Sequence, residues 1–420
     1  MPALALLTLL LVAPAEAPTS CAGTLSRERL VACALQASPA IEAEAIGVDA
    51  LAGRRRAART ILPSNPTVGV TVASRAGILS GQRDLNVYGN LSQEIEIAGQ
   101  RRKRSAVVDA EIDAQSRRVD AIRREVAAQV LVAYYELVAA REAQAMLARI
   151  AAATQALVDL AAEGERTGLA SGLAADVAAT SIVRIQRETV EADRRVEGAR
   201  STLAALLGQD PAAPTIDVRL DLTPLAVEGD LPALTELALG RRAELEVARA
   251  EQEARRRQIE LFRRARVPNP SLVAYAQRDG FAERVFGGGF SLPIPLPSPL
   301  GRTYAGEIAE ARARIRQADA ELERLRRAIQ VEVATAYQAV RARERELALF
   351  DADRIRRAEQ HVEALAQEMA AGRLPIREAV LLQQTFLDLL AAHLEARRAL
   401  GVASVELARA TGALPPGGTP

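Results

Sequence analysis

The sequence predicts a mainly α-helical protein with four short β-strands, arranged as two copies of one unit. Alanine, leucine, arginine and glutamate dominate its 420 residues, as they do in long helices and coiled coils. Aromatic residues make up 3% and tryptophan is absent, which argues against a large globular core. Two short segments with strand-like alternation interrupt the helical pattern at equivalent places, which indicates the repeat.

The two copies lie about 204 residues apart. Internal repeats at a fixed offset indicate duplicated structural units. We expect a first repeat over 18–208, an irregular linker over 209–230 that is rich in Pro and Asp, a second repeat over 231–412 and a tail over 413–420. The anchors of the repeat are Asn65-Pro66 and Asn269-Pro270, Gly168 and Gly372, Gly208 and Gly412, and Tyr134 with Tyr337 at an offset of 203.

Each repeat begins with a helix, predicted over about 26–61 and about 232–265. Ser26 is a suitable N-cap for the first of these helices, and Leu25 and Leu30 have the spacing of a hydrophobic staple.

A pair of strands follows in each repeat, over 66–97 and over 270–297. Within 85–97 and 286–296 apolar residues alternate with others, and period two with one apolar face is typical of a sheet with one wet side. The partner strands are predicted over 66–73 and 271–277.

A very long helix comes next, over about 99–163 and about 304–370. At 1.5 Å per residue the first would extend roughly 100 Å. Its apolar residues recur at intervals of three and four, which is the pattern of a coiled-coil seam and requires neighbouring helices. Gly168 and Gly372 end the two helices, and a return helix then runs to Gly208 or Gly412.

The N-terminus resembles a secretory signal peptide over 1–17, with an uncharged stretch and a small-residue cleavage site. No uncharged apolar run of 18 residues follows, so we expect no transmembrane helix. Cys21 and Cys33 leave three alternatives open: lipidation of Cys21, a disulfide between the two cysteines, or free thiols.

The strands have the length needed to cross a bilayer in a tilted barrel. Four strands cannot close a barrel, and an open edge is not tolerated in lipid, so closure requires at least two chains, and three would supply twelve strands. Five of the twelve aromatic residues fall in the strand regions, as an interfacial girdle would require. They are Tyr88, Tyr275, Phe281, Phe286 and Phe290.

This ordered set of segments resembles the outer membrane efflux protein family, the TolC-like channels. The resemblance covers nearly the whole mature chain and implies a homotrimer with a 12-stranded barrel in outer-membrane lipid and a long α-helical coiled-coil barrel in the periplasm. It also implies docking to a periplasmic adaptor (membrane fusion) protein and an inner-membrane pump. The segments that carry it are LSQEIEIAGQRRKR (91–104), FSLPIPLPSPLGRTYAGEIAEARA (290–313), AYYEL, AYQAV, RTGLAS and AGRLPI.

The resemblance also implies that the turns at the helix tips contact the adaptor. The residues at the matching positions are Gly168, Leu169 and Ala170 in the first repeat and Gly372, Arg373 and Leu374 in the second. The alternative is that both glycines serve only as helix C-caps, which need a positive φ.

Acidic residues near the tips are candidates for a periplasmic aperture. Glu378 lies at a position where the family often has an acid, and Asp176 is the nearest acid in the first repeat. Three copies would form a ring of carboxylates that favours cations. The alternative is a solvated helix face.

Other kinds of function find no support in the sequence. The net charge of +1 provides no field for nucleic acid. His361 and His393 stand alone, and neither metal-ligand spacing, a cofactor motif nor a nucleophile–base set is visible, so we expect no enzyme. The basic segment 99–104 is interpreted as a solvated positive belt or a phospholipid contact.

We therefore expect a passive outer-membrane exit duct of a tripartite efflux system, whose tips open when an adaptor binds. Two alternatives remain: the outer-membrane component of type I protein secretion, and, in a different class, a periplasmic coiled-coil adaptor or structural protein.

Overall fold

The computed structural model of the chain describes residues 21, 23–76, 78, 81–168, 171–279, 283–297 and 299–414. The predicted signal peptide therefore lies outside the described residues. The chain forms two compact units, and each unit takes segments from both repeats. Unit 1 comprises 1–42, 123–237 and 332–420, and unit 2 comprises 43–122 and 238–331.

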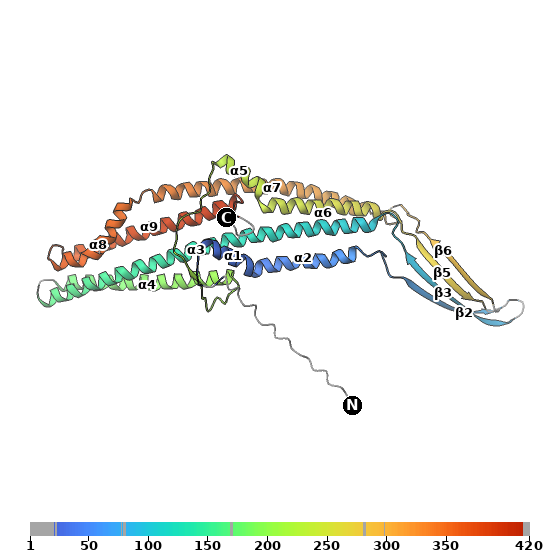
Figure 1. The fold of residues 1–420 in the computed structure, drawn as a ribbon, viewed down its shortest axis with the longest axis horizontal. Coiled ribbons are helices and arrows are strands. Elements are labelled where there is room, and N and C mark those ends of the chain that lie inside the picture. Colours follow the sequence, from blue (N-terminus) through green and yellow to red (C-terminus); the bar gives the residue numbers. More distant parts are fainter. Residues whose placement is uncertain are drawn as a thin grey trace, which may run out of the picture. The chain divides into compact units, whose positions relative to one another are not determined.

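The helices and strands follow the predicted order, and Figure 1 shows them along the chain. Unit 1 contains β1 (Thr24–Leu25), α1 (Arg27–Ala37), α4 (Gly172–Leu206), β4 (Asp217–Val218), most of α5 (Leu231–Arg241), α8 (Ala352–Ala370) and α9 (Ile376–Ala410). Unit 2 contains most of α2 (Pro39–Ala58), β2 (Thr67–Ala76), β3 (Arg83–Glu94), α6 (Ala243–Ala265), β5 (Ser271–Arg278) and β6 (Arg284–Ser291). Helices α3 (Gln100–Arg166) and α7 (Ala305–Leu347) contribute to both.

The first helix of each repeat is broken once, and the sequence pattern did not indicate these breaks. The helix expected over 26–61 ends at Ala37, and α2 starts at Pro39, because proline lacks an amide donor and disfavours helical geometry at the preceding Ser38. In the second repeat Arg242 lies between α5 and α6. Its backbone is extended, as that of Ser38 is, although no proline follows it. The predicted cap is confirmed, since the Ser26 side chain accepts a hydrogen bond from the Arg29 amide at 3.4 Å.

The long helix of repeat 1 is confirmed, whereas that of repeat 2 is not. Helix α3 runs without a break for 67 residues. The single helix predicted over 304–370 is wrong, because α7 ends at Leu347 and α8 begins at Ala352. The Asp351 side chain accepts hydrogen bonds from the amides of Asp353 and Arg354 and so starts a new helix at this point.

The four strands of unit 2 form one antiparallel sheet in the order β2-β3-β5-β6 (Figure 1). The two predicted strand pairs are therefore joined through β3 and β5. Strand β6 ends at Ser291, earlier than the predicted 296, and residues 292–297 lie outside the ladder. Pro293, Pro295 and Pro297 have no amide hydrogen to donate, so this segment cannot continue the strand.

The sheet has one apolar and one polar face. Val70, Gly89, Ala276 and Phe286 face one another in register across the four strands, and Val68, Val70, Phe286 and Phe290 on this face are 70–77% exposed. The opposite face carries Thr71, Tyr88, Asn90, Tyr275 and Gln277.

The predicted aromatic girdle needs a correction. Tyr88 and Tyr275 lie on the polar face, with ring centroids 5.6 Å apart, while Phe286 and Phe290 lie on the apolar face. Phe281 falls outside the described residues. The Tyr275 ring covers Gly287 of β6, where a Cβ atom would collide with it, so glycine at this position makes room for the tyrosine.

The inter-repeat linker is ordered against α3 in unit 1. Within it β4 pairs in parallel with β1, and the Arg219 amide donates to Leu25 at 2.9 Å. The hydroxyls of Tyr134 and Tyr135, both fully buried, donate to the carbonyls of Arg219 and Thr223 at 2.7 and 2.6 Å. Burial raises the pKa of Tyr134 to about 12, so its hydroxyl keeps the proton that it donates.

The N-terminal segment is held by a disulfide. Cys21 and Cys33 are bonded, with their Cα atoms 5.8 Å apart, which decides among the three alternatives for these cysteines. Because Cys33 lies in α1, the bond ties the residues that precede β1 to that helix.

Among the described helices, α3 alone is long and apolar enough, by length and composition, to cross a membrane. Only 28% of its most apolar 18-residue stretch is buried. A core helix meets the same criterion, so α3 by itself does not indicate a membrane span.

Candidate functional site

The first helix tip ends α3 in unit 1. Gly168 has φ +76°, and its amide donates to the Glu165 carbonyl at 3.1 Å. Thr167 adds a side-chain hydrogen bond to the Glu163 carbonyl at 2.9 Å. A Cβ atom on Gly168 would meet nothing within 4 Å, so the positive φ alone requires glycine here. The predicted contact residues Leu169 and Ala170 lie outside the described residues.

The second tip, between α8 and α9, has the same kind of cap. Gly372 has φ +70°, and the Arg373 amide reaches back to the Glu368 carbonyl at 3.0 Å, as in a Schellman motif. The Arg373 guanidinium also pairs with the Glu368 carboxylate through two contacts of 2.6 and 2.8 Å. Arg373 is exposed, whereas Leu374 packs against the cluster of Leu157, Leu365 and Ala379. Leu374 therefore already has a place in the protein's own core.

The predicted acids lie near these tips. Glu378 is in the first turn of α9 and Asp176 is in α4, and both are exposed. Neither carboxylate has an ion-pair partner in the part of the chain that the structure describes. Their charges are therefore available to solvent.

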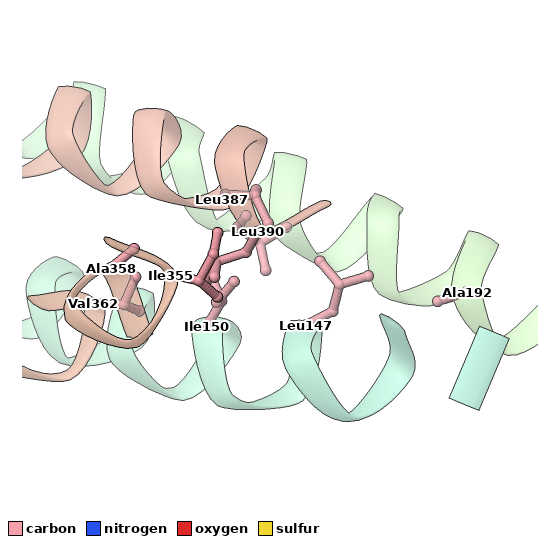
Figure 2. Packing of buried hydrophobic residues seen from close by; sticks show 9 residues of the cluster. Leu147, Ile150, Ala192, Ile355, Ala358, Val362, Leu387 and Leu390 are labelled. Atoms are coloured by element: carbon pink, nitrogen blue, oxygen red, sulfur yellow. The ribbon is translucent and has the colours of Figure 1, made fainter. Parts of the chain in front are cut away.

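An apolar core joins α3, α4, α8 and α9 beside the tips. Leu147 and Ile150 of α3 face Leu387 and Leu390 of α9, as Figure 2 shows. The full cluster also includes Ile185, Ala192, Ile355, Ala358 and Val362.

Two polar contacts between these helices were not predicted. The Gln383 amide of α9 donates to the Thr154 hydroxyl of α3, with both side chains buried. Arg184 of α4 pairs with Asp388 of α9 at 3.4 Å. Arg184 and Asp388 are 204 positions apart and so occupy equivalent places in the two repeats. Their opposite charges at equivalent places are the sequence signal that could have predicted this ion pair.

A groove of about 1730 Å³ lies between α3, α4 and α9 in unit 1. Alanines form much of its wall, and six glutamates and five arginines surround them. Most of these charges pair with one another: Arg398 with Glu136 and Glu395, and Arg194 with Glu191 at 2.7 Å. Hydrogen bonds from Arg194 and Arg195 lower the pKa of Glu191 to about 2. The balance of charge means that the groove has little preference for cations or anions.

None of these arrangements forms a catalytic set. No group of three or more histidine, cysteine, aspartate or glutamate side chains with metal-binding geometry occurs among the described residues.

A sequence model of the outer membrane efflux protein family matches the chain twice, over residues 30–209 and 234–413. The chain belongs to the outer membrane efflux protein family. The two matched segments begin and end 204 residues apart, which is the offset of the predicted repeat. Protein CyaE of Bordetella pertussis is 26% identical over 254 residues, or 58% of this chain, and the match spans about half of CyaE (53%).

Two solved structures have the same fold. A membrane protein from Pseudomonas aeruginosa superimposes with a TM-score of 0.74 at 21% identity, covering 92% of each chain. The CmeC outer membrane channel of Campylobacter jejuni gives 0.71 at 16% identity, covering 92% of this chain and 85% of CmeC. The predicted TolC-like fold is thus confirmed, and family membership confirms the predicted location in the outer membrane, with an extension into the periplasm. CmeC is an outer membrane channel, and the family is one of outer membrane efflux proteins, not of enzymes.

Proposed function

We propose that this chain is the outer-membrane exit duct of a tripartite efflux system. It acts as a passive homotrimeric channel-tunnel that docks to a periplasmic adaptor and an inner-membrane pump and lets small molecules or ions leave the cell. The pump supplies the energy, because the chain itself carries no catalytic site among its described residues.

The sheet of unit 2 is the observation that carries the proposal. Each of its outer strands, β2 and β6, pairs with one described strand only, so its other edge faces no strand of the described chain. Its exposed apolar face, with Val68, Val70, Phe286 and Phe290, suits lipid. Unpaired edges are not tolerated in lipid, so β2 of one chain must meet β6 of another, and three chains form a twelve-stranded barrel.

The mass of the detergent-extracted particle tests this assembly. Three chains of 44.8 kDa give a particle of about 134 kDa before removal of the signal peptide. Size exclusion with light scattering should give this mass, and negative-stain imaging should show a short barrel at one end of a tube. A monomer that stays soluble without detergent would contradict the proposal and favour a periplasmic adaptor.

The helix tips are the proposed contact with the adaptor. Gly168 and Gly372 set the direction of the turns, and Arg373 is exposed beside the second glycine. Leu169 and Ala170 follow Gly168 in the sequence and are included in the proposed contact, and Leu374 positions the second tip through its packing.

A matched pair of arginines tests the docking. The Arg373 and Arg356 side chains are 64% and 66% exposed, and each pairs with an acid of α8, Glu368 and Asp353 respectively. Arg373→Ala should weaken cross-linking to the adaptor and raise sensitivity to exported compounds, while Arg356→Ala should change neither. Equal behaviour of the two variants would count against contact at this tip.

Asp176 and Glu378 are proposed to ring the periplasmic opening. Three copies would bring six carboxylates to it and favour cations. The double variant Asp176→Asn/Glu378→Gln should lower the cation selectivity of single channels in planar bilayers. Glu197→Gln, which removes an exposed acid elsewhere on α4, serves as the control. Unchanged selectivity in the double variant would leave the two acids as a solvated helix face.

A further inference from the structure

Basic residues gather in unit 2 where three helices meet the strands. Helix α2 ends in Arg54, Arg55, Arg56 and the following Arg59. Helix α3 begins with the run 101–104, and α6 ends with Arg263 and Arg264. These runs are far apart in sequence, so their meeting is a property of the fold.

Buried polar contacts hold the three helix ends at one level. The Gln100 amide, which is buried, donates to Asn269 Oδ1 at 2.8 Å and to the Val267 carbonyl at 3.3 Å. Arg104 and Ser105 donate to the Ala58 carbonyl at 3.3 and 3.4 Å. The end of α2, the start of α3 and the end of α6 are thereby joined directly below the strand that begins at Ser271.

Only part of this charge is neutralised within the chain. Arg54 pairs with Glu111 at 2.9 Å, Arg55 with Asp109 at 2.7 Å, Arg104 with Glu96 at 2.5 Å, and Lys103 with Glu260. Six further arginines are exposed and form no ion pair with any described residue. This arginine collar consists of Arg56, Arg59, Arg101, Arg102, Arg263 and Arg264.

Aromatic residues lie beside the end of α6, next to the arginine collar. The Tyr304 ring stacks on Phe262 of α6 at 6.1 Å between centroids, and the Arg302 guanidinium lies 4.5 Å above the Tyr304 ring. Arg266, just after α6, donates to the Thr303 carbonyl at 3.0 Å and joins this group to the helix end. Aromatic rings with a polar tip beside exposed arginines are typical of the boundary between lipid and water.

We propose that the arginine collar binds the phosphate groups of phospholipids in the periplasmic leaflet of the outer membrane. The inference rests on the proposed function, which places the apolar face of the sheet in lipid. The collar then lies at the level of the head groups, where phosphate is the anion at high local concentration. A guanidinium binds phosphate through two parallel hydrogen bonds, and arginines that form no ion pair within the chain have none to break when they do so.

Lipid binding by charge-matched double variants tests the collar. Arg101→Gln/Arg102→Gln and Arg263→Gln/Arg264→Gln each remove two collar charges. Arg249→Gln/Arg327→Gln is the control, because both residues are exposed, unpaired with any described residue, and lie many turns from the strand ends on α6 and α7. Native mass spectrometry of the full-length protein in detergent would count bound dimyristoylphosphatidylglycerol, with the zwitterionic phosphatidylcholine of the same chain length and inorganic phosphate as comparison probes.

The wild type and the control should bind phosphatidylglycerol equally, and each collar variant should lose about tenfold in affinity. Phosphatidylcholine should bind more weakly, and inorganic phosphate at the same concentration should not compete. Equal lipid binding by all proteins, or displacement of the lipid by inorganic phosphate, would overturn the inference. The mass of the same particles separates the two proposals: a soluble wild-type monomer refutes the channel, whereas a trimer whose collar variants bind lipid normally refutes only the collar.

Discussion

The two repeats have the same order of elements but differ in their longest helix. Helix α3 continues through 67 residues, while its counterpart is divided into α7 and α8. The break lies at residues 348–351, where the sequence is ALFD. The equivalent residues of α3, 203 positions earlier, are 145–148 with the sequence AMLA. All four residues of AMLA favour a helix, whereas Asp351 favours a cap.

The break also supplies a packing contact. Phe350 packs against the core cluster of unit 1 and against His393 of α9, with ring centroids 5.4 Å apart. Two repeats with the same pattern can therefore end their helices at different places. One capping residue and one aromatic residue, Asp351 and Phe350, are enough to introduce the break.

The repeats differ a second time at equivalent tyrosines. Tyr134 is buried and its hydroxyl donates to the linker, whereas Tyr337 is partly exposed. The linker lies against Tyr134 and Tyr135 of α3, and its Leu225 amide also donates to the Ser404 hydroxyl of α9 at 2.9 Å.

Truncating these two tyrosines should give the largest contrast. Tyr134→Ala removes a buried aromatic ring and a hydrogen bond and should lower the free energy of unfolding by about 3–5 kcal/mol. Tyr337→Ala should cost less than about 1 kcal/mol. Denaturant unfolding in detergent, followed by circular dichroism, measures both. A large effect of Tyr337→Ala would mean that another chain covers this residue in the assembly.

Removing the disulfide, which lies in repeat 1, should cause the next largest loss of stability. Cys33→Ser frees the segment before β1 and should cost about 2–3 kcal/mol, as expected for a loop of 12 residues. Reductant should destabilise the wild type by a similar amount and leave the variant unchanged. Mass spectrometry of the mature N-terminus adds a check, since an acylated Cys21 in the wild type would contradict the disulfide.

A dependence on pH should accompany the break in repeat 2. Burial lowers the pKa of His393, and Arg397 lowers it further, while Glu359 and Glu142 act in the opposite direction. Below pH about 6.5 the unfolded state binds the proton more readily, so stability should be complete above this value and fall as the pH drops. His393→Gln should reduce this slope in thermal unfolding measured between pH 5 and 8. An identical slope in both proteins would assign the dependence to other groups.

The cap at the break should have the smallest effect. Asp351→Ala removes the acceptor for the amides of Asp353 and Arg354 and should lower the melting temperature slightly. Asp351→Asn should retain most of the stability, because asparagine caps equally well. If Asp351→Ala were neutral, the packing of Phe350 would be sufficient to maintain the break.

Much of the fold could be predicted from local patterns. The alternation in 66–73 and 85–97 predicted β2 and β3, and the spacing of three and four predicted α3, because period and face are properties of neighbouring residues. The helix breaks at Ser38, Arg242 and Asp351 were missed, since an apolar series continues across a break of one or a few residues.

The candidate site was predicted less completely. The cap glycines Gly168 and Gly372 were identified, because a positive φ leaves a mark in the sequence. The packing of Leu374 and the pair of Thr154 with Gln383 were not, because each depends on which helices become neighbours.

The sequence by itself determined the four strands of the antiparallel sheet and their order along the chain, the length of α3 and the class of the protein, since these follow from periodicity, turn residues and repetition; the two-residue strands β1 and β4 are too short to show a period. Tertiary structure alone decided which face of the sheet carries Tyr88 and Tyr275, that the linker is bound by Tyr134 and Tyr135, and that three basic runs meet in one collar. The physical reason is that register, burial and the meeting of charges are relations between residues far apart in the chain, and no local pattern records them.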